Sequence, residues 1–215
     1  MTRLKVCCIA NEEELALALA AGATAIGLVG PMPSGPGPIP LDRIRQLAPL
    51  VPPPVESFLL TSQTTLHGIV EEHAQALTTT LQLVDHVPHD VLAELRHARP
   101  GIRLVQVIHV SGERSIAEAL RVAPLVDALL LDSGNPTAAV KELGGTGRTH
   151  DWTVSRGICE RSPVPVFLAG GLHAGNVAQA IATVRPYGVD VCSGVRTDGR
   201  LDAGKLAAFA AAIAG

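Results

Sequence analysis

Short runs of apolar residues alternate with amphipathic runs from one end of the chain to the other. A short apolar run bounded by Gly, Pro or polar residues predicts a buried strand, and an amphipathic run predicts a helix. This alternation is typical of parallel strands joined by crossover helices. The predicted strands span residues 4–9, 25–29, 55–60, 80–84, 104–110, 128–131, 164–169 and 189–192, and the predicted helices span residues 12–21, 41–50, 65–76, 91–99, 115–122, 152–161, 176–184 and 203–214.

The number of strand–helix units bears on the choice between two α/β architectures. Eight units fit a (β/α)8 barrel, or TIM barrel, with residues 1–215 as one domain. The alternative is an open, doubly wound sheet, which uses the same alternation. In the first unit, Asn11 with Glu14 three residues later resembles a capping box, and Gly22 stands where a helix would end in the left-handed conformation.

The composition narrows the class of partner. With 17 Lys and Arg against 20 Asp and Glu, the formal net charge of -3 gives no basic field that points to nucleic acid or an anionic membrane. No apolar stretch approaches the roughly 20 residues of a membrane span, and the acidic triplet Glu12, Glu13 and Glu14 is not typical of a signal peptide. We therefore expect a cytoplasmic protein that binds a small molecule.

The cysteines and histidines do not predict a metal site. The eight His are scattered, and the Cys lack the paired spacings of a zinc site or of a disulfide scaffold. We interpret the Cys as reduced thiols, as expected in the cytoplasm. The four Cys are Cys7, Cys8, Cys159 and Cys192.

Two segments interrupt the alternation. Residues 30–40, GPMPSGPGPIP, are too rich in Pro and Gly for a helix or a strand, and predict a loop that is either functional or a stiff connector. Residues 133–151 predict a long polar loop after the sixth strand. Its GGTGR cluster lacks the ending of a nucleotide-binding P-loop, and Gly145, Thr146 and Gly147 instead suit a mobile loop that closes over substrate.

Glycine-containing turns end the last two predicted strands. Gly170 and Gly171 follow the seventh strand, and Ser193 and Gly194 follow the eighth. Glycine lets the backbone N–H groups approach an anion closely, and the loops after strands seven and eight form the usual phosphate site of a (β/α)8 barrel. The sequence therefore predicts a phosphate site, although each segment taken alone could be a tight turn.

Two ionisable side chains stand at the predicted mouth of the barrel. Cys7 lies near the end of the first strand, and Asp132 closes the buried run ALLLD, where it must reach solvent or find a partner. Facing each other across a pocket, they would form an acid–base pair. The alternative for Cys7 is a small buried apolar residue without a chemical role.

Six motifs run in an order known from one family: KVC at 5–7, AGATAIGLV at 21–29, LLLDS at 129–133, GGTGRTHDW at 144–152, LAGGLHAGNVAQAI at 168–181 and VRPYGVDVCSGV at 184–195. A chain with these motifs resembles the phosphoribosylanthranilate isomerases of tryptophan synthesis. The resemblance implies an Amadori rearrangement of an N-ribosyl amine 5-phosphate without a cofactor. It places the base on Cys7, the acid on Asp132, and the phosphate on the backbone of Gly170, Gly171, Ser193 and Gly194.

The departures from the family lie in the half of the mouth that would hold the amine part of the substrate. Cys8 stands where the family has Gly, and Pro36 stands where the family's SPR motif has the arginine that grips the anthranilate carboxylate. The family's VQLHG becomes LQLVD at 81–85, and its basic residue on the fifth strand becomes His109. The phosphate half keeps the family pattern.

Three functions stay open on the sequence. The first is a phosphoribosylanthranilate isomerase proper, with Arg43 or His109 in place of the missing arginine. The second is an isomerase of the same fold that acts on another phosphorylated sugar, and the third is a sugar-phosphate-binding relative without turnover. Retention of Cys7 and Asp132 argues against the third, because a binder needs neither. Barrels of this family occur as monomers and dimers, so we expect a monomer or a homodimer.

Overall fold

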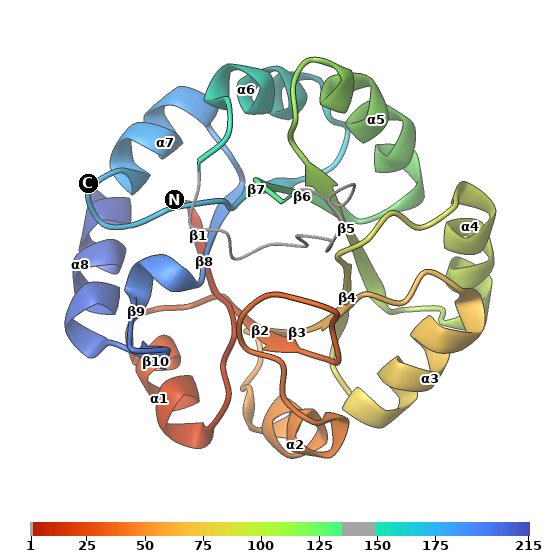
Figure 1. The fold of residues 1–215 in the computed structure, drawn as a ribbon, viewed down its shortest axis with the longest axis horizontal. Helices are drawn as coiled ribbons and strands as arrows, with labels where there is room; N and C mark the ends of the chain where they lie inside the picture. The colour runs from red at the N-terminus through yellow and green to blue at the C-terminus, as the bar shows by residue number, and fades with distance from the viewer. Residues whose placement is uncertain (1, 135–148) are drawn as a thin grey trace.

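Eight parallel strands close into a barrel in the computed structural model, which describes residues 2–134 and 149–215 (Figure 1). Each strand pairs with the next, and the eighth pairs back with the first in a register that sets Leu4 opposite Val189. The (β/α)8 prediction is confirmed, and the open-sheet alternative is wrong, because an open sheet leaves two edge strands unpaired. The strands are β1 (Arg3–Val6), β2 (Ala25–Val29), β3 (Glu56–Thr61), β4 (Thr80–Leu83), β5 (Arg103–His109), β6 (Ala128–Asp132), β7 (Val166–Leu168) and β8 (Gly188–Val191).

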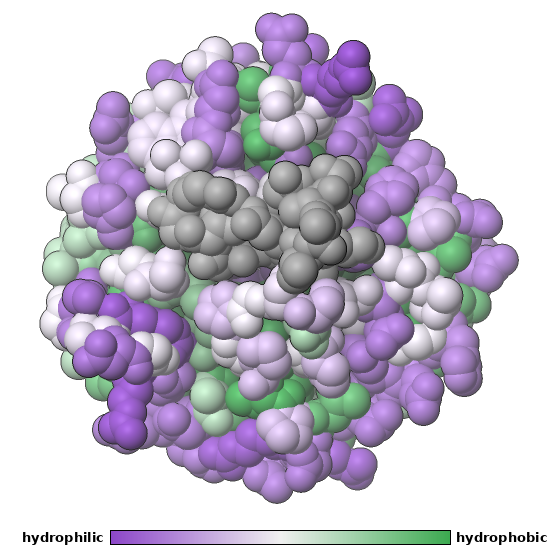
Figure 2. Space-filling model, viewed as in Figure 1, coloured by the Kyte–Doolittle hydropathy of each residue, from purple (hydrophilic) through white to green (hydrophobic). Residues whose placement is uncertain are grey.

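A ring of helices surrounds the barrel in Figure 1. The outer faces of the strands and the inner faces of the helices share one core, dominated by Leu, Ile, Val and Ala. Hydrophilic residues dominate the periphery of the face shown in Figure 2, where the helices meet solvent. The helices are α1 (Glu12–Ala20), α2 (Leu41–Leu47), α3 (Leu66–Ala76), α4 (His89–Ala98), α5 (Arg114–Val122), α6 (Trp152–Arg161), α7 (Val177–Val184) and α8 (Ala203–Ala214), with the 3-10 turns η1 (Ala48–Leu50), η2 (Ala123–Leu125) and η3 (Ser193–Val195).

A second, smaller core fills the inside of the barrel. It includes the rings of Phe58 and Phe167, which pack edge to face with 6.3 Å between their centroids. The interior is therefore packed with side chains and is not an open pore, as expected for a barrel of this size. Within the described ranges, no helix has the length and the apolar composition needed to cross a membrane.

Two element boundaries differ from the predictions for local reasons. β1 ends at Val6 rather than at residue 9, because Cys8 has the left-handed φ of 64° and an extended strand cannot continue through it. The predicted helix over residues 41–50 divides into α2 and η1, where Pro49 lacks the N–H that an α-helix would use.

The two ends of α1 show how its predicted caps form. Asn11 Oδ1 accepts the N–H of Glu14 at 2.9 Å, and Gly22 has the predicted left-handed φ of 83°. Glu14 does not complete a capping box with Asn11, because its carboxylate accepts the N–H of Ala10 instead. The same carboxylate also forms an ion pair with Arg196, whose Nη1 lies 2.8 Å from Glu14 Oε1. Arg196 belongs to a short hairpin, made of β9 (Arg196–Thr197) and β10 (Arg200–Leu201), that precedes α8.

Candidate active site

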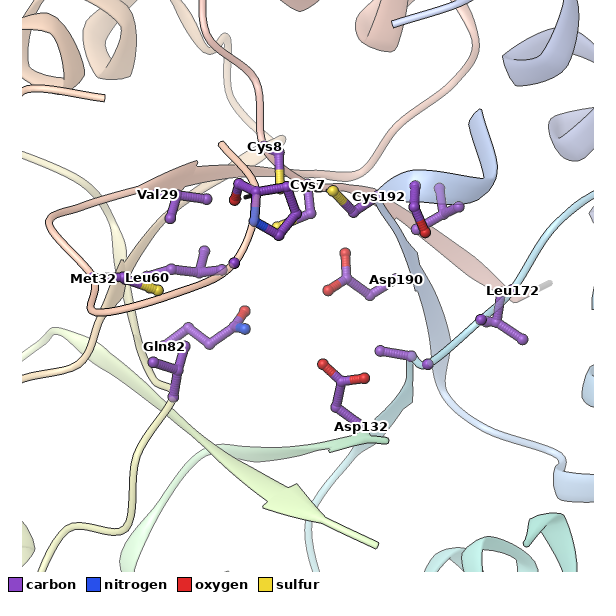
Figure 3. A pocket seen from close by; sticks show the side chains of 18 of the residues that line it. Cys7, Cys8, Val29, Met32, Leu60, Gln82, Asp132, Leu172, Asp190 and Cys192 are labelled. Carbon is purple, nitrogen blue, oxygen red and sulfur yellow. Dashed lines mark hydrogen bonds between the residues drawn. The ribbon is translucent and has the colours of Figure 1, made fainter. Parts of the chain in front are cut away.

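A pocket opens at the carboxyl ends of the barrel strands, and the loop of residues 30–40 forms part of its wall (Figure 3). The N–H of Ile39 donates to the carbonyl of Val29 at 2.9 Å, so this loop turns back to the end of β2. The pocket is lined by Cys7, Cys8, Val29, Met32, Ser34, Gly35, Pro36, Leu60, Gln82, Val84, Asp132, Ala169, Gly170, Gly171, Leu172, Asp190, Val191, Cys192 and Ser193.

Cys7 follows β1 and lies on the pocket wall (Figure 3). Its N–H donates to the carbonyl of Val191 at 2.9 Å, which fixes its height on the barrel rim. Gly27 of β2 leaves room for the thiol, because a Cβ on Gly27 would lie 2.8 Å from Cys7 Sγ and 3.2 Å from Lys5 Nζ. The thiol and the ammonium group of Lys5 are therefore close neighbours.

Lys5 forms a buried ion pair with Asp190, a pair that the sequence analysis missed. Lys5 Nζ donates to Asp190 Oδ2 at 2.9 Å, and the Lys5 side chain is fully buried. Burial alone would lower the pKa of Lys5, but the charge of Asp190 and its hydrogen bond outweigh burial and raise the pKa above its usual value. The only sign of this ion pair in the sequence is that a charged residue interrupts each of two apolar runs, Lys5 in LKV and Asp190 in VDV.

Two buried oxygens in the pocket lack a hydrogen-bond partner within the described residues. They are Oδ1 of Asp190 and Oε1 of Gln82. Both side chains point into the pocket in Figure 3, Asp190 from β8 and Gln82 from β4. A buried acceptor without a donor is costly, so these oxygens are suited to accept hydrogen bonds from a bound hydroxyl or amine.

Asp132 ends β6 and points its carboxyl group into the same pocket as Cys7 (Figure 3). Burial raises the pKa of Asp132, and the charge of Asp190 raises it further, while the N–H of Ser133 at 2.7 Å and the nearby His109 oppose the rise. The net rise favours the protonated carboxyl, which is the form that can donate a proton. The structure therefore brings together the two residues that the sequence analysis selected.

The two strand ends predicted to bind phosphate form one wall of the pocket. Gly170 and Gly171 have φ of 82° and 62°, a region that favours glycine, and both line the pocket with Ser193. The N–H groups of these three residues donate to no acceptor in the described part of the chain. Gly194 does not line the pocket, and its role is steric, because a Cβ there would lie 1.9 Å from the carbonyl oxygen of Leu172.

The opposite wall of the pocket is mainly apolar. It is built by Val29, Met32, Leu60 and Val84, with Gln82 as its polar group. Among the lining residues that the structure describes, none is Lys, Arg or His.

The two cations considered as substitutes for the missing arginine do not line the pocket. Arg43 is paired with the carboxylate of Glu12 and also donates to the carbonyl of Ala10. His109 Nε2 lies 2.9 Å from the carbonyl oxygen of Val84, which can only accept, so this nitrogen carries the hydrogen. Both contacts argue against the prediction that either residue replaces the arginine.

The predicted mobile loop of Gly145, Thr146 and Gly147 lies outside the described residues. In residues 2–134 and 149–215, no three His, Cys, Asp or Glu side chains are arranged to hold a metal ion.

Comparisons with known proteins give this site a context. Residues 66–212 match the family model of N-(5'phosphoribosyl)anthranilate (PRA) isomerase. An N-(5'-phosphoribosyl)anthranilate isomerase from Haloferax volcanii is 41% identical over 219 residues, which cover 99% of this chain and 93% of that protein.

Solved structures agree with the sequence relatives. A phosphoribosyl anthranilate isomerase in complex with reduced 1-(o-carboxyphenylamino)-1-deoxyribulose 5-phosphate is similar with a TM-score of 0.81 and 26% identity, over 98% of this chain and 97% of that one. A structure of mutually generated monomers of a dimeric phosphoribosylanthranilate isomerase from Thermotoga maritima has a TM-score of 0.82 and 26% identity over 100% of both chains. With its closed barrel, the family match and the relative at 41% identity, the chain belongs to the N-(5'-phosphoribosyl)anthranilate isomerase family.

Proposed function

We propose that the chain converts N-(5'-phosphoribosyl)anthranilate into 1-(o-carboxyphenylamino)-1-deoxyribulose 5-phosphate, with Cys7 as the base and Asp132 as the acid. One observation carries this assignment of roles. One pocket is lined both by the thiol of Cys7, which lies beside an ammonium group, and by the carboxyl of Asp132, whose pKa is raised. The wall of this pocket also offers backbone N–H groups that have no acceptor among the described residues. A site that only bound a sugar phosphate would need neither the thiol nor the carboxyl.

The reaction requires one proton to be donated and one to be removed. The protonated carboxyl of Asp132 gives its proton to the ring oxygen of the ribose, the bond from C1 to that oxygen breaks, and the nitrogen lone pair forms an iminium ion. Cys7 as a thiolate then removes the proton from C2, and the electron pair moves into a C1–C2 double bond. The enolamine that results becomes the ketone when the C2 hydroxyl proton is lost and C1 is protonated.

The ion pair beneath the pocket supports the base. Asp190 keeps Lys5 protonated, so a positive charge lies beside Cys7. The unpaired Oδ1 of Asp190 faces the pocket, where it can accept a hydrogen bond from a ribose hydroxyl.

The phosphate is proposed to bind the N–H groups of Gly170, Gly171 and Ser193. Unpaired backbone N–H groups are good ligands for phosphate, because they present a partial positive charge without the bulk of a side chain. Gly194 contributes by letting the turn after β8 pack against the loop after β7.

The fluorescence of anthranilate derivatives allows a direct test with phosphoribosylanthranilate as substrate. Cys7→Ser and Asp132→Asn should each lower kcat by about 10²- to 10⁴-fold, which is the usual contribution of a general acid or base. Cys159→Ser, a thiol outside the pocket, should leave kcat unchanged. A Cys7→Ser variant with near-normal kcat would remove the thiol from the mechanism.

We infer that the protein acts in the cytoplasm as a monomer or a homodimer. The dimeric relative from Thermotoga maritima supports the second state. Sedimentation equilibrium of the purified protein distinguishes the two states.

A further inference from the structure

Three thiols gather where β1 and β8 end, and the proposed mechanism uses only one of them. Cys7 and Cys8 follow β1, and Cys192 follows β8, which is the neighbour of β1 in the closed barrel. The Sγ atoms of Cys8 and Cys192 share a hydrogen bond at 2.7 Å (Figure 3). Both are free thiols.

The backbone holds this pair in register. The N–H of Cys7 donates to the carbonyl of Val191 at 2.9 Å, so the residues that follow them, Cys8 and Cys192, are brought side by side. The two sulfurs of a disulfide lie about 2.05 Å apart, so the Sγ atoms of Cys8 and Cys192 would have to approach each other by less than about 1 Å to form one.

Neighbouring groups give the two thiols different acidities. The hydrogen bond with Cys8 lowers the pKa of Cys192, and the charge of Arg196 lowers it further against the effect of burial. Hydrogen bonds with Cys192 and Cys7, together with burial, raise the pKa of Cys8. Because the thiolate is the species that attacks a disulfide, Cys192 is suited to react first.

A small oxidant can reach the pair through the pocket. Cys8 and Cys192 both line it, and Cys192 is only partly buried. Cys159 on α6 does not line it, and burial raises the pKa of its thiol to about 11. Cys159 is therefore a matched control for general thiol oxidation.

We propose that Cys8 and Cys192 form a modification site, at which a small disulfide such as oxidised glutathione converts them reversibly into a disulfide. The Cys192 thiolate, its proton released to solvent, attacks one sulfur of the oxidant and expels one thiolate, leaving a mixed disulfide. Cys8 then loses its proton, attacks Cys192 Sγ and expels the second thiolate. Two protein thiols give up two electrons and two protons, and the oxidant leaves as two thiols.

The position of the cross-link connects it with the proposed chemistry. Cys8 follows the proposed base, and Cys192 precedes Ser193 of the proposed phosphate wall. The loop of residues 30–40 also rests on Cys8, because a Cβ on Gly37 would lie 2.5 Å from Cys8 Cβ. A misplacement of about 1 Å can cost about 100-fold in rate, so we expect oxidation to lower kcat/KM by about 10- to 100-fold. This loss rests on the proposed function, whereas formation of the disulfide does not.

The test exposes the full chain to oxidised glutathione, alkylates the remaining thiols and analyses the peptides by mass spectrometry. We expect the loss of two thiols per chain, a cross-link between the peptides that carry Cys8 and Cys192, and reversal by dithiothreitol. Cys159→Ser should behave as the unaltered protein does. Cys8→Ser should form no cross-link, and Cys192→Ser should keep the same activity, whatever its level, before and after oxidation.

Cys7→Ser identifies the partner of Cys192, because Cys7 and Cys8 occupy one peptide. The cross-link should persist in this variant, even though we expect it to be inactive. Loss of the cross-link in Cys7→Ser would overturn the proposal, as would a stable mixed disulfide without a cross-link in the unaltered protein. A cross-link that leaves activity unchanged would support the modification site and overturn its expected effect on catalysis.

Discussion

The two walls of the pocket present different parts of the chain to a ligand. The proposed phosphate wall, made of Gly170, Gly171 and Ser193, offers backbone N–H groups, whereas the proposed amine wall, made of Val29, Met32, Leu60, Gln82 and Val84, offers side chains. Backbone recognition requires little of the sequence except glycine where the chain turns or packs closely. Side-chain recognition changes with every substitution, while the barrel beneath it stays the same.

The departures that the sequence resemblance implies fall on one side of this contrast. The pattern expected of the phosphate wall is kept, whereas Pro36, which stands where the resemblance places the family's arginine, lines the pocket beside the amine wall. The described amine wall is apolar apart from Gln82, so it suits the flat ring of an aromatic amine better than it suits a carboxylate.

Among the changes made to either wall or its support, the largest effect is expected from Gly194→Ala, in the turn that carries Ser193 of the proposed phosphate wall. The new Cβ would lie 1.9 Å from the carbonyl oxygen of Leu172, so the turn after β8 must move and carry the N–H of Ser193 with it. We expect kcat/KM for phosphoribosylanthranilate to fall about 100-fold, mainly through KM. Gly204→Ala is the control, since its nearest atom would lie 3.4 Å away. An unchanged KM in Gly194→Ala would contradict a phosphate site at this turn.

The pH dependence tests the acid that lies between the walls. The proposed acid, Asp132, must be protonated to act, so its contribution to kcat/KM is present below its pKa and is lost as pH rises through that pKa, by about tenfold per pH unit. Because burial raises this pKa, the decline should begin above the ordinary carboxyl value of 3.8. Asp132→Asn should abolish that decline along with most of the rate. If the same decline remained in the variant, another group would be the acid.

A smaller effect is expected from Gln82→Leu in the amine wall. The change removes the unpaired Oε1 that faces the pocket, and we expect KM for phosphoribosylanthranilate to rise about tenfold, the worth of one hydrogen bond of about 1.4 kcal/mol. Inhibition by inorganic phosphate should not change, because the phosphate wall is untouched. Gln75→Leu on the exposed surface of α3 is the control. Equal weakening of phosphate inhibition would show that the two walls do not act separately.

The smallest effect is expected from Pro36→Arg, which returns a forked cation to the loop beside the amine wall. Pro36 is exposed, and exposed ion pairs contribute about 0.2–1 kcal/mol, so KM should fall by no more than about fivefold. Pro36→Ala separates the loss of proline from the gain of charge. A fall in KM that Pro36→Ala reproduces would show that loop stiffness, rather than carboxylate binding, is responsible.

Local patterns along the chain predict the order and type of the elements, since each element depends on residues that are close in the sequence. Apolar runs gave the eight strands, and Asn11 and Gly22 gave the two ends of α1. Cys7 and Asp132 could be selected because each lies at the end of a predicted strand, and parallel strands end at one rim. Cys8 shows where this reasoning stops, because its left-handed φ ends β1 early and no local pattern predicts it.

Which side chains meet where β8 pairs with β1 depends on the complete fold. Lys5 and Asp190 are 185 residues apart, and Cys8 and Cys192 are 184 apart, yet each pair is in contact. The pairing of β1 with β8 brings them together, and its register depends on how all eight strands tilt and close. The periodicity of apolar residues predicts which face of a strand is buried, but it does not predict which distant residue lies opposite on the neighbouring strand.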